Sequence, residues 1–176
     1  MLPKYKYLLT YRYSEIVHDL TAEFCNLHIS KFSRTYDQMV QAARSGKQNI
    51  VEGVGQSVTS KKGELKLLGV AKASIEELIT DFEDFLRQKG LEIWPKTHSK
   101  IKDFRALGIL ATKNYPLKLI KLPKSPLEAA NLLLTLCHQL TFLLDRQISS
   151  LEEKFVREGG FSENLLRRRL GNRLHK

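Results

Sequence analysis

The sequence predicts an all-α protein, an antiparallel four-helix bundle with a long basic connection before the fourth helix and a short C-terminal helical appendage. In four segments, apolar residues recur at alternating spacings of three and four, the period of an amphipathic helix. Serine, proline and glycine stand at the ends of these segments, and 176 residues with 42% hydrophobic content suit one domain. We therefore expect a bundle over residues 1–160, with the connection at 91–124, and an appendage over 161–176.

The first two helices are predicted over residues 13–27 and 36–53. One face of the first carries the apolar residues Tyr13, Val17, Leu20, Phe24 and Leu27. The stripe on the second is made of smaller residues, namely Tyr36, Met39, Ala43, Gly46, Ile50 and Gly53. Ser33 stands where the second helix needs an N-cap. Short loops before and after this helix imply antiparallel neighbours.

The third helix is predicted between Ser60 and Gly90. Its apolar face consists of Leu68, Ala71, Ile75, Leu78, Phe82 and Phe85. Ser60 is placed to cap its N-terminus, and Gly90 follows its last apolar residue, where a helix commonly ends.

The fourth helix is predicted to begin at Pro126 and to end before Gly159. Its apolar face consists of Ala130, Leu134, Cys137, Thr141, Leu144, Ile148, Leu151 and Phe155. Ser125 and Glu128 have the spacing of a capping box, and Pro126 suits the first helical position. Gly159 and Gly160 end the helix.

A second apolar stripe lies beside the first on this helix. It consists of Leu132, Leu133, Leu136, Leu140 and Leu143. The resulting apolar arc is wider than one bundle core requires, so either the connecting segment or another subunit must cover it. The connection contains Pro95, Pro116 and Pro123, and a short helix near residues 97–107 is expected inside it.

The excess positive charge is confined to two segments. The net charge is +10; residues 87–124 hold ten Lys and Arg against two Asp and Glu, and residues 161–176 hold five against one. Clustered Lys and Arg bind phosphate backbones through counterion release, without base-specific contacts. The side chains predicted to bind nucleic acid are Lys96, Lys100, Lys102, Arg105, Lys113, Lys118, Lys121 and Lys124 in the connection and Arg167, Arg168, Arg169 and Arg173 in the appendage.

The basic segments allow other interpretations. Trp94, Phe104 and Tyr115 lie among the lysines, where they can either stack on unpaired bases or pin the connection to the bundle. The whole basic surface can instead serve solubility or an acidic protein partner, which makes the chain a protein-interaction module. The appendage has an apolar side and three consecutive arginines, so it can bind nucleic acid, an anionic membrane or another subunit.

Other classes of protein receive little support. No apolar stretch is long enough to predict a membrane span, no signal-peptide pattern is present, and we expect a cytoplasmic protein without membrane contact. Cys25 and Cys137 have no disulfide or zinc spacing and are expected to be core residues. Glu15 and His18 have the Glu-x-x-His spacing of di-iron bundles, but no second such motif occurs. We therefore predict no enzyme activity, no cofactor and no metal.

Two segments carry a resemblance to a known family. Residues 42–53, AARSGKQNIVEG, followed by residues 68–78, LGVAKASIEEL, resemble the four-helix-bundle family of ribosomal RNA intervening-sequence proteins and of diversity-generating-retroelement accessory variability determinant proteins. That family has an Asn-Ile-Ala-Glu-Gly helix end followed by an Ala-x-Gly-Ser-Leu-x-Glu segment. The matching residues, expected to have structural roles, are Asn49, Glu52, Gly53, Ser74 and Glu77.

The resemblance implies a non-enzymatic bundle that forms a homo-oligomer, commonly a homopentamer. It also implies a basic surface for RNA or DNA and, in retroelements, a reverse transcriptase partner. Asn49 and Glu52 are expected to hold the end of the second helix against the third through hydrogen bonds. The sequence departs from the family at Val40 and Gln41, where an arginine pair usually precedes the double alanine.

Overall fold

The computed structural model describes the backbone of residues 1–174 and the side chains of residues 1–171. All regular secondary structure in this range is helical, which confirms the predicted all-α class. The elements follow in the order η1 (Lys4–Tyr7), α1 (Leu9–His28), α2 (Arg34–Gln56), α3 (Lys61–Gln88), α4 (Ser99–Thr112), α5 (Pro126–Glu158) and α6 (Phe161–Leu174).

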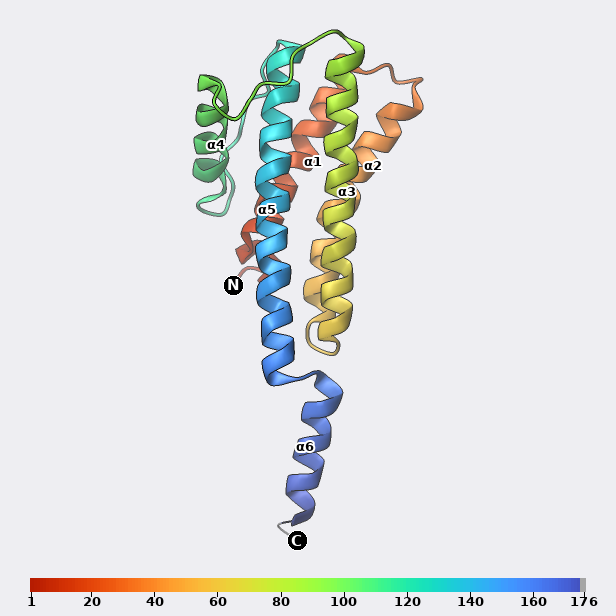
Figure 1. Ribbon diagram of the computed structural model, residues 1–176, viewed down its shortest axis with the longest axis vertical. Helices are drawn as coiled ribbons and strands as arrows, with labels where there is room; N and C mark the ends of the chain where they lie inside the picture. Colours follow the sequence, from red (N-terminus) through yellow and green to blue (C-terminus); the bar gives the residue numbers. More distant parts are fainter. Residues whose placement is uncertain (175–176) are drawn as a thin grey trace.

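Helices α1, α2, α3 and α5 contribute most of the buried core residues. Helix α1 packs against α2 and α5, and α3 also packs against α2 and α5, so each of the four has two neighbours. Successive members of this group run in opposite directions along the long axis (Figure 1). Helix α4 lies against the outer side of α5 and contacts α1, whereas α6 extends beyond the end of α5 (Figure 1).

The helix ends show which terminal signals act as predicted. The Ser33 side chain accepts a hydrogen bond from the backbone N–H of Thr35, and Ser60 accepts one from Gly63. Gly90 and Gly159 adopt φ of 65° and 73°, the left-handed region that favours glycine after a helix. Ser33 and Ser60 therefore cap helix N-termini, and Gly90 and Gly159 follow helix ends, as the sequence predicts.

The predicted capping box at the start of α5 is wrong. Ser125 is the N-cap residue, but its side chain makes no capping hydrogen bond. The Glu128 carboxylate is instead engaged by the Lys100 ammonium of α4. A charged partner competes for the carboxylate that a capping box needs, so the start of α5 depends on Pro126 and on packing.

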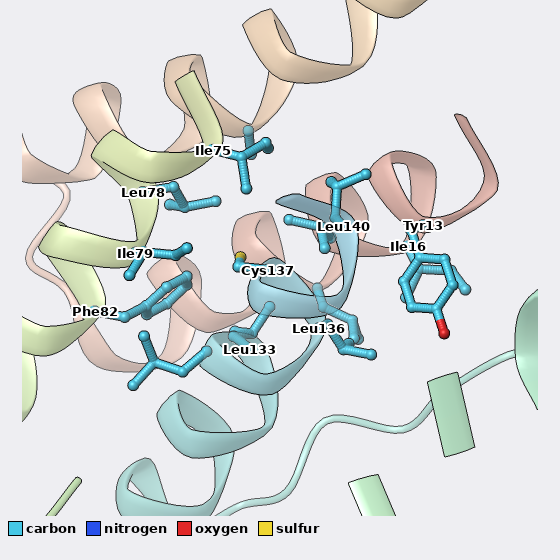
Figure 2. Close-up of a cluster of buried hydrophobic side chains, with 14 of the residues drawn as sticks. Tyr13, Ile16, Ile75, Leu78, Ile79, Phe82, Leu133, Leu136, Cys137 and Leu140 are labelled. Atoms are coloured by element: carbon cyan, nitrogen blue, oxygen red, sulfur yellow. The ribbon is translucent and has the colours of Figure 1, made fainter. Parts of the chain in front are cut away.

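The predicted apolar faces of α3 and α5 meet in the core. Leu78 and Phe82 of α3 face Leu133 and Cys137 of α5 (Figure 2). The prediction is wrong at Leu27 of α1, which is 60% exposed. The core near that end of α1 is closed by Phe24, whose ring lies 5.1 Å from Phe82 and 4.9 Å from Phe85 between centroids. The cysteines are fully buried free thiols, as predicted.

Small residues bring α2 and α3 close together. A Cβ atom added to Gly46 would lie 2.6 Å from Cδ1 of Ile75, closer than real Cβ contacts allow. Beside it, the hydroxyl oxygens of Ser45 and Ser74 lie 3.0 Å apart in a hydrogen bond between the helices. The small stripe of the second predicted helix therefore marks a tight helix–helix contact.

The connecting segment covers part of the second stripe of α5. Leu132, Leu136 and Leu140 are buried, Leu133 is buried facing α3, and Leu143 is only partly buried. The connection contributes the buried residues Ile101, Ala111, Ile120 and Leu122. Of the two coverings considered from the sequence, the connecting segment therefore covers part of the stripe within one chain, and Leu143 stays partly exposed. The expected short helix near residues 97–107 is present as α4 but extends to Thr112. It is longer because Gly108 and Ala111 also pack inward.

Helix α5 is long and apolar enough, by length and composition alone, to cross a membrane. In the structure, 61% of its most apolar 18-residue window is buried inside the protein. The core helix of a globular domain has the same composition, so burial accounts for these apolar residues.

Candidate nucleic-acid interface

The cations of the basic connection lie at separate places in the structure. Lys96 and Arg105 lie at a pocket between α4 and α5, whereas Lys118, Lys121 and Lys124 lie in the extended segment that follows α4. Lys102 and Lys113 are exposed on α4 and at its C-terminal end. The predicted residues are therefore not brought to one point.

Few of these cations are neutralised. Of the eight predicted in the connection, only Lys100 has a carboxylate within 4.0 Å in the described part of the chain. Outside the connection, Lys61, Lys72 and Lys154 are paired with Asp or Glu, whereas Lys31, Arg44 and Lys66 have no carboxylate within 4.0 Å among the described residues. The connection is therefore distinguished by its local excess of positive charge, and most of its cations also lack an internal partner.

The pocket between α4 and α5 has a volume of about 530 Å³. Residues 93–96 form one wall, and Ile101 and Arg105 of α4 form a second. The third wall is a face of α5 that includes Leu134, His138 and Phe142. Its lining is mostly apolar, and its basic side chains are Lys96, Arg105 and His138.

The pKa of His138 is shifted by the groups around it in this pocket. His138 is exposed on one side, and the partial burial of its ring is the main cause that lowers its pKa below the ordinary histidine value. Glu83 of α3 opposes the shift, and the nearby Lys96 and Arg105 add to it. The imidazole is therefore neutral near pH 7, and an anion among these groups would favour its protonated form.

A buried amide fixes the wall that contains Trp94. The Asn131 side chain, 1% exposed, donates to the carbonyl oxygens of Glu92 and Leu127 and accepts from the backbone N–H of Trp94 at 2.8 Å. One asparagine on α5 thus holds residues 92–94 beside the pocket. Because an unpaired buried amide is costly, this arrangement is expected to be rigid.

The three aromatic residues of the connection contact their own chain. The Trp94 ring stacks on His98 at 4.2 Å between centroids with an 8° interplanar angle, and the Phe104 ring lies at 6.2 Å. The Tyr115 hydroxyl accepts a hydrogen bond from Lys6 Nζ at 2.8 Å. These contacts favour the interpretation that the aromatic residues pin the connection, although Trp94 also lines the pocket.

The segment after α4 runs beside α1. Residues 115–120 share a hollow with Glu15 and Asp19, and residues 119–122 and Lys124 share another with Glu23 and His28. Acidic residues of α1 therefore lie near Lys118 and Lys121, although none forms an ion pair with them among the described residues.

The appendage presents its arginines to solvent. Arg167, Arg168 and Arg169 are exposed on α6. Arg173 lies in the helix, but its side chain falls outside the described residues. The apolar side chains of α6, Phe161, Leu165, Leu166 and Leu170, are also exposed. The structure thus leaves both sides of this helix without a partner in the described chain.

The residues that match the family motif differ in what they do. The Asn49 amide donates to the Ser45 carbonyl and hydroxyl within α2 and makes no hydrogen bond to α3 among the described residues, so the expected direct bond between the helices is not seen. Its link to α3 is indirect, through the hydrogen bond between Ser45 and Ser74. Gly53 is buried against Glu64 and Leu67.

The hydrogen-bonding role expected of Glu52 is not seen in the structure. Glu52 is exposed and makes no hydrogen bond to α3 within residues 1–171, because it lies on the outer side of α2. Glu77 is exposed and lines a polar hollow with Arg34 and Ser45.

The potential metal ligands and the cysteines are dispersed in the described chain. No group of three or more His, Cys, Asp or Glu side chains able to hold a metal ion occurs in the described region. Burial raises the pKa of the Cys25 thiol to about 12 and also raises that of Cys137, so neither is a reactive thiolate.

Sequence patterns did not identify the α5 side of the pocket. His138, Gln139 and Phe142 fall outside the basic segments and between the two apolar stripes of α5. Phe142 is 59% exposed, and the Arg146 guanidinium lies 5.9 Å from its ring centroid. A large aromatic residue off the core stripe, followed by arginine one turn later, is the signal that would have found it.

Comparisons with protein-family models, curated proteins and solved structures found no match to this chain. The assignment of function therefore depends on the geometry and charge described above.

Proposed function

We propose that this chain is a non-enzymatic, homo-oligomeric, antiparallel four-helix bundle that binds nucleic acid, RNA or DNA, as an accessory factor. The bundle is formed by α1, α2, α3 and α5, and the closed set of contacts among them supports this architecture. One observation supports nucleic-acid binding above the others: the cations of the connection are segregated from the acidic residues and mostly lack carboxylate partners.

Unpaired cations favour a polyanion as the ligand. A phosphate backbone releases condensed counterions when Lys and Arg neutralise it, and this gain does not require a base-specific site. The exposed Lys96, Lys102 and Lys113 and the exposed arginines of α6 fit a contact of this kind, directed at the backbone. A lysine in a salt bridge must break that ion pair before it binds a phosphate. Paired lysines therefore contribute less to the affinity for nucleic acid.

Oligomer formation is supported by the apolar side of α6. Leu165, Leu166 and Leu170 are each about half exposed on a helix that projects from the body (Figure 1). Apolar side chains clustered on one helix are commonly covered by another subunit. The family resemblance favours a homopentamer and a reverse transcriptase as the protein partner. The cytoplasmic location stays a prediction from the sequence.

The test is a titration of fluorescent single-stranded RNA and duplex DNA with the purified protein at several salt concentrations, with the particle mass measured by light scattering. Binding that weakens steeply with salt, from a particle of several subunits, is the expected result. Substituting Arg167, Arg168 and Arg169 by glutamine should weaken binding if α6 contributes. No binding at low salt would overturn the proposal and favour recruitment of an acidic protein, which a nuclease-treated pull-down would then identify.

A further inference from the structure

The pocket between α4 and α5 has the size and lining of a small-molecule site. Its volume of about 530 Å³ lies within the roughly 300–1,000 Å³ range of pockets that bind small organic ligands. Apolar side chains form most of the lining, and residues 93–95 close one side. A ligand with an apolar or aromatic body fits such walls better than a bare inorganic ion.

The basic side chains around the pocket favour an anionic ligand. Lys96 comes from the segment before α4, Arg105 from α4 and His138 from α5, so three parts of the chain bring basic groups to one cavity. Neither Lys96 nor Arg105 has a carboxylate within 4.0 Å among the described residues. A phosphate between them would supply the missing negative charge.

The mouth of the pocket carries an exposed aromatic ring. Phe142 lines the cavity yet is 59% exposed, and Arg146 adds a guanidinium near its ring. Exposed rings beside cations are a recurrent means of stacking unpaired bases, because every base has a π face while the cation holds the adjacent phosphate. Trp94 also lines the same cavity.

We infer that this pocket holds one unstacked nucleotide of a single-stranded nucleic acid, with the base against Phe142 and a phosphate between Lys96 and Arg105. The inference rests on the proposed function and adds to it a preference for single strands. The bases of a duplex are already stacked and cannot enter, whereas those of a single strand can. The remaining cations of the connection then contact the backbone on either side.

The protein contains one tryptophan, Trp94, which lines this pocket, so its intrinsic fluorescence reports on occupancy. The experiment titrates the full chain with a ten-nucleotide single-stranded RNA, with the duplex of the same sequence and with free nucleoside monophosphate, and records both Trp94 emission and RNA anisotropy. The single strand should change Trp94 emission and bind about tenfold more tightly than the duplex.

Two variants separate the pocket from the general charge effect. Phe142→Ala, at an exposed position that the fold does not depend on, should weaken single-strand binding by about fivefold or more, as expected for a lost base stack, while leaving the salt dependence unchanged. The double variant Lys96→Gln with Arg105→Gln should also abolish the emission change. Its matched control, Lys118→Gln with Lys121→Gln, removes the same charge elsewhere and should retain it.

The outcomes distinguish this inference from the proposed function. If RNA binds with strong salt dependence but Trp94 emission is unchanged and Phe142→Ala binds like the parent, the pocket inference is overturned and the proposed function stands. If duplex and single strand bind equally, the strand preference is overturned. If only the free nucleoside monophosphate changes Trp94 emission, the pocket is a small-molecule site and not a strand site. If no RNA binds, both proposals fall.

Discussion

The contact between α2 and α3 and the contact between α4 and α5 are built on different principles. The first is a close approach of small residues around Gly46, with the hydroxyls of Ser45 and Ser74 joined across it. The second is close near Gly108 and opens into a cavity bordered by Lys96 and Arg105. The hollow beside Ser45 and Ser74 balances Arg34 with Asp37 and Glu77, whereas no carboxylate of the described residues lines the cavity between α4 and α5.

This difference separates structure from function within one helical protein. A tightly packed contact without unpaired cations is fully explained by its contribution to stability. A contact that leaves an open cavity among unpaired cations forgoes stability that better packing would give, which is typical of a binding site. The predictions below test this division, beginning with the largest expected effect.

The Gly46→Val variant should lower the free energy of unfolding by about 2–3 kcal/mol, because the new side chain must displace Ile75 in a packed core. The Gly108→Val variant meets the ends of the Gln139 and Leu136 side chains and should cost about 1 kcal/mol, since α4 is peripheral and can shift. Urea denaturation of both variants measures the difference. Equal losses would show that α4 is as integral to the core as α2 and α3.

The Asn131→Ala variant should lower the free energy of unfolding by about 2 kcal/mol, because the backbone groups of Glu92 and Trp94 lose their buried partner. It should also release the wall of the pocket. Trp94 emission should therefore shift to longer wavelength in the folded variant. Unchanged emission at full helical content would mean that other contacts hold residues 92–94.

Nucleotide affinity should rise as the pH falls below the ordinary histidine range, since the free protein holds His138 neutral. Burial, Lys96 and Arg105 lower the pKa of His138 and Glu83 raises it, whereas a bound phosphate would favour the protonated ring. A rise of one pKa unit on binding corresponds to about a tenfold gain in affinity at low pH. The His138→Gln variant should lose this gain, and a gain that persists in it would contradict the assignment.

The helix caps provide the smallest effect. Ser60→Ala should cost about 1 kcal/mol, because its side chain caps α3 through the N–H of Gly63. Ser125→Ala should cost only a few tenths of that, because Ser125 makes no capping hydrogen bond to α5. Thermal unfolding of the two variants measures the difference in stability. A larger loss of stability for Ser125→Ala than for Ser60→Ala would mean that a capping box does form at the start of α5.

Much of the helical layout could be predicted from the sequence, because periodicity depends on which residues are buried. The faces of α3 and α5 carry Leu78, Phe82 and Cys137 into the core as predicted. The capping box failed because Glu128 has a distant partner, Lys100, that no local pattern reveals. The same reason limits predictions at Leu27, whose exposure depends on where α1 ends against its neighbours.

The site was harder to predict than the fold. Charge counting located Lys96 and Arg105, because segregation of Lys and Arg is visible in one dimension. It could not show that α4 folds back on α5, and so it missed His138 and Phe142. A pocket built from residues about 30–45 positions apart becomes visible only when the packing of the connection is known.

The most direct test of the central claim compares unpaired with paired cations. The slope of the logarithm of affinity against the logarithm of salt concentration would be measured for a single-stranded 20-nucleotide RNA. One triple variant replaces Lys96, Lys102 and Arg105 by glutamine. The control replaces the salt-bridged residues Lys61, Lys72 and Lys154, which removes the same formal charge. Each lost phosphate contact reduces the slope by about 0.7. We predict a reduction of about 2 for the first variant and little change for the control, whereas equal reductions in both would contradict the account.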